Sequence, residues 1–266
     1  MNDKERISSI WHERLPDTVT DSLHDIMDRA KTRDTPVQVF FRADDIAYVD
    51  EPFRRLMNSF LFNKTPLCLA VVPEWLTHHN WGAMQEFNPK NPLWCWHQHG
   101  KSHTNHQQEG KKCEFGDARS REKISRDLAE GKKNLLVHLG NLFYPVFTPP
   151  WNRCSQDTLE LLNEMNYAAV SRSKGAKPPA GKILPDLAIN IDLHTRREVD
   201  SNEGWKNLLA EFAAAAECGC MGIMLHHQLM NDAAFVFLDQ LLALLKSNRN
   251  ISLVSFRELR LSGKQD

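Results

Sequence analysis

The feature that most constrains this fold is a regular alternation of short apolar, β-branched runs with amphipathic stretches. Between most of the runs lie helical patterns, such as Ile124 to Leu139, where apolar residues share one face. This alternation predicts an α/β fold with a parallel sheet, and about seven or eight such units indicate a (β/α) barrel. A doubly wound open sheet is the rival, but no G-x-G-x-x-G follows the first run. The predicted strands are 37–45, 66–73, 93–99, 144–151, 167–173, 187–195, 221–228 and 251–256.

The chain reads as one domain over residues 1–266. It has 266 residues, 41% of them hydrophobic, and no linker composition interrupts it. We expect residues 1–36 to form a helical N-terminal extension and 37–256 to form the barrel.

The charge balance narrows the class of partner. Lys and Arg total 33 against 34 Asp and Glu, so the net charge is -1 and no basic field favours nucleic acid. A small or neutral molecule is the expected partner. The charged N-terminal stretch and the absence of any run of about 18 apolar residues predict a cytoplasmic protein without an integral membrane segment.

Polar residues gather where the predicted strands end. In a barrel of parallel strands, every carboxyl end faces the same mouth, so residues far apart in sequence converge there. The residues at these ends are Asp44, Asp45, His99, Pro150, Trp151, Asn152, Asp192, His194, His226 and His227.

Two histidines and a carboxylate at or just after these strand ends suit a divalent metal. His99 and His103 are spaced i and i+4, which places both rings on one side if the chain turns helically after Gly100, and Asp45 could add the carboxylate. Asp44 would remain free to act as a base. The spacing H-x-x-x-H also arises by chance in a chain with 12 histidines, but the Asp-Asp pair at the end of a buried strand strengthens the prediction.

The stretch "WCWHQHGKSH" offers a second pairing, because His97 and His99 could bind a metal as H-x-H. Alternate residues of a strand share a face, so His97 would lie one layer deeper than His99. We therefore expect His97 to be a hydrogen-bonded core residue that supports the ligands.

Four short motifs, "FRADD", "HGKSH", "FTPPWN" and "IMLHH", occur in this order. They resemble those of the metal-dependent polysaccharide deacetylases with a NodB-homology domain, over roughly residues 37–256. The resemblance implies a distorted (β/α) barrel and hydrolysis of an N- or O-acyl group on a sugar. By position it implies Asp44 as the base and His226 as the acid. The metal ligands it implies are Asp45, His99 and His103.

The sequence departs from the family pattern at several positions. Ile46 stands where the family has glycine, and Thr148 stands in place of the third-motif arginine that orients the base. Arg42 shares a strand face with Asp44 and is the substitute we expect, ahead of Arg153 or Arg172.

The last motif changes as well, since His227 replaces an aspartate beside His226. Because neighbouring strand residues face opposite ways, only one of this pair can point into the mouth. Asp192 could accept a hydrogen bond from His226, or instead cap a helix or pair with Arg196.

The leading hypothesis is therefore a deacylase of an amino sugar or cell-surface glycan precursor. It would use a divalent metal, zinc first and otherwise cobalt, nickel, iron or manganese, with Trp151 and Asn152 beside the sugar. One alternative is a non-haem iron oxygenase with the same ligands. The other is a catalytically silent carbohydrate-binding relative.

Overall fold

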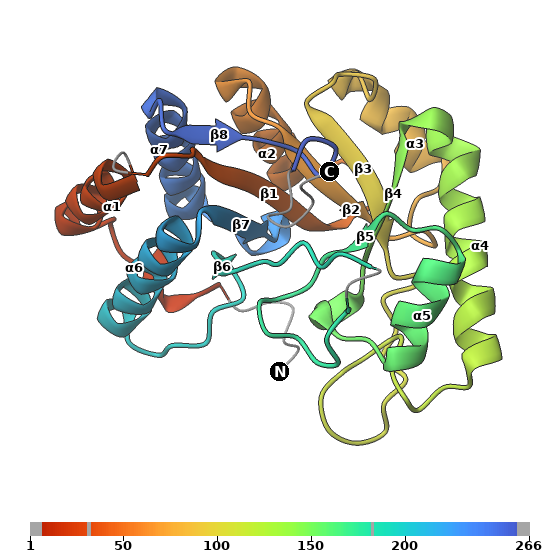
Figure 1. The fold of residues 1–266 in the computed structure, drawn as a ribbon. Coiled ribbons are helices and arrows are strands. Elements are labelled where there is room, and N and C mark those ends of the chain that lie inside the picture. The colour runs from red at the N-terminus through yellow and green to blue at the C-terminus, as the bar shows by residue number, and fades with distance from the viewer. Residues whose placement is uncertain (1–6, 31–32, 182–183, 260–266) are drawn as a thin grey trace. The chain divides into compact units, whose positions relative to one another are not determined.

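The computed structural model describes residues 7–30, 33–181 and 184–259, which fall into two compact units (Figure 1). The first unit takes in Met1–Ala43, Asp50–Leu67 and Asn190–Ser255, and the second takes in Asp44–Val49, Cys68–Ile189 and Phe256–Asp266. The prediction of a single domain stays a prediction.

The first unit is built on parallel strands. β1 pairs with both β7 and β8, and β7 pairs with β6. Its helices pack in pairs, α1 on α6 and α2 on α7. The elements are η1 (Ser9–Trp11), α1 (Asp17–Ala30), β1 (Val37–Ile46), α2 (Glu51–Asn63), β6 (Ile191–Asp192), α6 (Ser201–Cys218), β7 (Cys220–Leu225), η5 (His227–Leu229), α7 (Asp232–Ser247) and β8 (Ile251–Leu253). The last three residues of β1, 44–46, belong to the second unit.

The sequence explains where these elements begin and end. Asp50 caps α2 by accepting a hydrogen bond from the Phe53 N–H at 2.8 Å. Gly219 ends α6 in the left-handed region, with φ 82°. β1 is buried along nearly its whole length, as expected for a parallel strand covered on both faces.

The second unit places β3 beside β4 and β4 beside β5, with register partners His99 and Thr148 at the carboxyl ends of β3 and β4. α4 packs on α5 and along β3, and a long loop joins β3 to α4 (Figure 1). The elements are β2 (Leu67–Val71), α3 (His78–Met84), η2 (Gln85–Phe87), β3 (Trp94–His99), α4 (Arg121–Leu139), η3 (Gly140–Leu142), β4 (Phe143–Thr148), η4 (Pro150–Asn152), α5 (Gln156–Glu164) and β5 (Ala169–Val170).

All eight predicted strands are present, and their strand pairs are parallel, which confirms the predicted distorted (β/α) barrel class. β5 and β6 are only two residues long, shorter than predicted, because the chain beside them continues through isolated bridges such as Ser173 with Ile189. Every helix between residues 7 and 259 is too short or too polar to span a membrane.

Candidate metal centre

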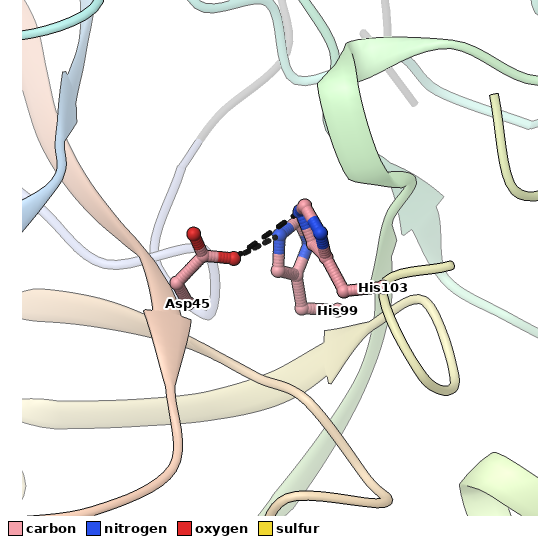
Figure 2. Close-up of side chains that lie close together, drawn as sticks. All are labelled: Asp45, His99 and His103. Atoms are coloured by element: carbon pink, nitrogen blue, oxygen red, sulfur yellow. Dashed lines mark ion pairs between the residues drawn. The ribbon is translucent and has the colours of Figure 1, made fainter. Parts of the chain in front are cut away.

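Three side chains of the second unit converge at the ends of β1 and β3. Nε2 of His99 and Nε2 of His103 each lie 3.3 Å from the same oxygen, Oδ1 of Asp45. Figure 2 shows both imidazole rings turned toward this carboxylate. The three ligand atoms lie within 4.8 Å of one another, which is the spacing that a single divalent cation can bridge.

The backbone brings these side chains together in an unusual way. Asp45 and His103 both have positive φ, 61° and 58°, and Gly100 has φ 57°. A helical turn after Gly100 was the condition for pairing His99 with His103, and left-handed backbone at Gly100 and His103 brings the two rings together instead. Left-handed backbone at a residue other than glycine costs about 1–2 kcal/mol, and such strain tends to collect at functional positions.

The orientation of His99 indicates what lies between the three groups. Nδ1 of His99 donates a hydrogen bond to the Thr148 carbonyl at 3.0 Å, so the Nε2 atom of the neutral ring carries a lone pair. That lone pair faces an Asp45 oxygen, and two facing lone pairs require a proton or a cation between them. The donor set of two imidazoles and one carboxylate fits a divalent metal ion.

The electrostatics of His99 agree with this geometry. Burial acts to lower the pKa of His99, but the hydrogen bond to Asp45 and the negative charges of Asp44 and Asp45 raise the pKa above its usual 6.5. Asp44 is 2% exposed. Two adjacent carboxylates therefore hold positive charge at this place, whether it belongs to a proton or to a metal.

His97 lies in the core, as predicted. It is fully buried, its Nε2 lies 3.0 Å from Oγ1 of Thr148, and its ring meets Phe256 edge-on at 5.0 Å. Thr148 thus contacts both histidines of β3, His97 through its hydroxyl and His99 through its carbonyl. Thr148 therefore supports the two histidines rather than supplying a charge.

Aromatic side chains border the cluster. The ring of Trp151 lies 4.5 Å from His103, and that of Trp75 lies 5.6 Å from it on another segment. Tyr48, which is 42% exposed, stacks on Trp75 at 6.5 Å. Asn152, like Trp151, has positive φ. Trp75 and Tyr48 were missed from the sequence, although Trp75 follows the end of β2 just as the predicted site residues follow other strands.

Three arginines were considered as substitutes for the arginine that Thr148 replaces, and they differ in their contacts. Arg172 is fully buried and pairs with Asp186 at 2.6 Å. Arg153 donates to the Lys112 carbonyl at 3.0 Å. Arg42, in the first unit, is also fully buried, and its Nη2 lies 3.1 Å from the sulfur of Met224. Its pairing with Asp44 stays a prediction.

A cluster of histidines lies in the first unit, after β6 and β7. The His226 backbone N–H donates to Nδ1 of His194 at 3.2 Å. His227 is 1% exposed, lies against Phe53, and has Nε2 3.9 Å from Asp50 Oδ1. His226 is partly exposed, so the two neighbours differ in accessibility. Both follow the end of β7 at Leu225, and His227 begins η5, so strand alternation does not apply to them and the choice between them stays a prediction.

His194 had no predicted role. Burial, followed by the charges that His226 and His227 can carry, holds the pKa of His194 well below its usual 6.5. Asp192 accepts hydrogen bonds from the backbone N–H groups of His194 and Thr195, at 3.0 and 2.9 Å. It therefore caps the turn after β6, which is not a helix. The hydrogen bond from His226 stays a prediction.

Comparisons with known proteins place the fold. No protein-family model matches the sequence, and no curated protein matches it. Among solved structures, a protein assigned as a polysaccharide deacetylase from Mycobacterium smegmatis has a TM-score of 0.61 at 13% identity, covering 84% of this chain and 89% of its own.

Two further structures share the fold. The allantoinase PuuE has a TM-score of 0.59 at 14% identity, with 86% of this chain and 90% of that one covered. A family 4 acetyl xylan esterase from Clostridium thermocellum was solved with a cobalt ion. It has a TM-score of 0.54 at 14% identity, with 83% of this chain and 89% of that one covered. The chain therefore has the fold of the polysaccharide deacetylases and family 4 carbohydrate esterases, as the four motifs predicted.

Proposed function

We propose that this chain is a metal-dependent hydrolase that removes an N-acyl group, acetyl first, from an amino sugar or a glycan precursor. The observation that carries the proposal is the convergence of His99 and His103 on one oxygen of Asp45, with the lone pairs of His99 and Asp45 facing each other. The cobalt ion of the acetyl xylan esterase supports a divalent metal at such a site. The expected cytoplasmic location stays a prediction.

Asp45, His99 and His103 would hold the metal, and zinc is the ion that this donor set favours first. A divalent cation at this place supplies Lewis acidity, which makes a water molecule more acidic and polarises an acyl carbonyl. The Thr148 carbonyl accepts a hydrogen bond from Nδ1–H of His99, which would leave the lone pair of Nε2 free to hold the ion. Asp45 neutralises part of the positive charge.

The proton transfers would use two further side chains. Asp44 is buried and adjacent to the ligand Asp45, and we propose that its carboxylate takes the proton of the attacking water. We propose Arg42 as the cation that keeps Asp44 ionised. His226 would donate the proton that the leaving amine needs, a role that rests on motif order and on its partial exposure beside the buried His227.

The aromatic residues suggest how a sugar would bind. Pyranose rings present apolar faces, and the rings of Trp151 and Trp75 both contact the ring of His103, with centroid distances of 4.5 and 5.6 Å. Replacing Trp75 with Ala should therefore raise KM for a glycan more than it lowers kcat, since the side chain is no metal ligand. Asn152, next to Trp151, would donate a hydrogen bond to a sugar hydroxyl.

The proposal is tested with purified protein stripped of metal and reloaded with zinc or cobalt under anaerobic conditions. The substrates are an N-acetylated chitooligosaccharide, acetylated xylan and allantoin, the last because PuuE shares the fold. Metal-dependent release of acetate from the first substrate, abolished in Asp44→Asn while the metal is retained, is the expected result. Hydrolysis of allantoin alone would refute an acyl-sugar substrate.

Two alternatives have distinct outcomes in the same assay. A non-haem iron oxygenase would be inactive without oxygen and active only with iron. A silent carbohydrate-binding protein would bind the oligosaccharide without turnover at any metal loading. A family 4 pseudoenzyme from Bacillus anthracis shares this fold, at a TM-score of 0.51 and 11% identity. It supports testing for a silent carbohydrate-binding protein.

A further inference from the structure

The loop between β3 and α4 contains a buried carboxylate, that of Glu114, which contacts the turn between the proposed ligands His99 and His103. Glu114 is 1% exposed and lies 11 residues after His103 in the sequence. Its Oε1 accepts the Ser102 N–H at 2.8 Å and the Ser102 hydroxyl at 2.9 Å. Its Oε2 accepts the Lys101 N–H at 3.3 Å.

These three hydrogen bonds engage the two residues that join Gly100 to His103. Gly100 at one end adopts positive φ without strain, but His103 at the other end, with φ 58°, is strained, so its backbone would relax unless other contacts hold it. A Cβ added to Gly100 would lie 2.2 Å from Oε2 of Glu114, which shows how closely the carboxylate approaches the backbone. Glu114 therefore fills the inside of the turn.

Other hydrogen bonds hold the Gly100 end of the turn. The Gly100 N–H donates to the Thr148 carbonyl at 3.1 Å, and the Gly100 carbonyl accepts from Nε2 of Gln98 at 2.9 Å. These bonds secure the His99 end. At the His103 end, the consecutive N–H groups of Lys101 and Ser102 turn inward to Glu114.

We propose that Glu114 is a positioning residue that holds the backbone of Lys101 and Ser102 so that His103 faces Asp45 together with His99. The proposal rests on the proposed metal site. An ionised carboxylate accepts on both oxygens, which suits three donors at once. An amide in its place has one accepting oxygen, and its NH₂ group would face a backbone N–H that is also a donor.

The experiment compares Glu114→Gln with Glu109→Gln, which makes the same chemical change at an exposed position of the same loop. Cobalt affinity is measured by competition with a chromophoric chelator, well below the unfolding temperature. Glu114→Gln should weaken cobalt binding by about 10- to 100-fold, the range typical of residues that orient metal ligands, whereas Glu109→Gln should match wild type. Equal affinity in all three proteins would overturn the proposal.

A second variant and a second measurement cover the cases in which Glu114→Gln does not fold or no cobalt binds. Ser102→Ala removes one of the three hydrogen bonds and serves if Glu114→Gln fails to fold; a several-fold loss of affinity is expected, and none would count against the proposal. The imidazole ¹⁵N shifts of His99 and His103 are recorded without metal. If wild type binds no cobalt, the proposed function fails, while Glu114's role is still decided: unchanged His103 shifts in the variant refute it.

Discussion

Replacing His103 tests the metal centre most directly. Since His103 has φ 58°, alanine would add backbone strain to the loss of a ligand. Asparagine tolerates the left-handed region, so His103→Asn removes the imidazole with the least change in backbone. We expect the variant to fold as wild type does, because its effect is confined to one partly exposed side chain.

The expected loss of affinity follows from the number of ligands. Structural zinc sites with four ligands bind with about 10–16 kcal/mol, or roughly 3–4 kcal/mol per ligand. One ligand of the three here is removed, while Asp45 and His99 remain. Since about 1.4 kcal/mol is tenfold in affinity, zinc binding should weaken by roughly a hundred- to a thousandfold.

The assay is zinc affinity by competition with a chelator, beside metal content after dialysis. His106→Asn is the matched control, because His106 is an exposed histidine three positions further along the same loop. Thermal unfolding of the metal-free proteins checks that neither variant has lost its fold. Zinc bound as tightly by His103→Asn as by His106→Asn would show that the metal, if any, lies elsewhere.

Three further predictions concern other parts of the molecule. Gly100→Ala should destabilise the protein by about 2 kcal/mol or more in chemical denaturation, because φ 57° and the tight contact inside the turn both oppose a Cβ; an unchanged midpoint would contradict this. His194 has a folded-state pKa well below 6.5, so the unfolded chain binds the extra proton and stability is lost as the pH falls below 6.5 toward the folded pKa. His194→Asn keeps an acceptor for His226 but cannot titrate, so its unfolding free energy should fall less steeply with decreasing pH, by up to about 1.4 kcal/mol per pH unit; parallel curves would refute it. Arg42→Met should lower the rate and move the acidic limb of the pH–rate profile upward with metal content unchanged, and an unaltered profile would make Arg153 the next candidate.

The strands could be predicted because their signal is local. A parallel strand covered on both faces is a short apolar run, and β1, β3 and β7 all appear in the sequence as such runs. The approach of Asp45 to His99, at the ends of β1 and β3, followed from the expected parallel topology, which directs the carboxyl ends of strands to one side. Strand alternation likewise assigned His97 to the core.

The contributions of the long loop could not be predicted. Glu114 lies in a polar stretch without periodicity, and its burial depends on the Lys101 and Ser102 N–H groups that only the folded turn presents. The same turn takes the place of the helical turn that was the condition for pairing His99 with His103. The i, i+4 spacing of His99 and His103 is satisfied by left-handed residues, a conformation that the spacing alone does not distinguish from a helical turn.

The two departures from the deacetylase motifs bear on catalysis more than on metal binding. Thr148 and Ile46 are both fully buried in the unit that holds the three proposed ligands, and Thr148 supports His99 through its carbonyl, a contact that any residue type at this position can make. The arginine's absence therefore leaves the ligand geometry intact and removes only a charge. Metal affinity should accordingly depend on the second unit's own residues, whereas turnover should depend in addition on Arg42 and His226. A variant of Arg42 that loses metal and activity together would contradict this separation, because it would tie the charge to the ligands rather than to the base.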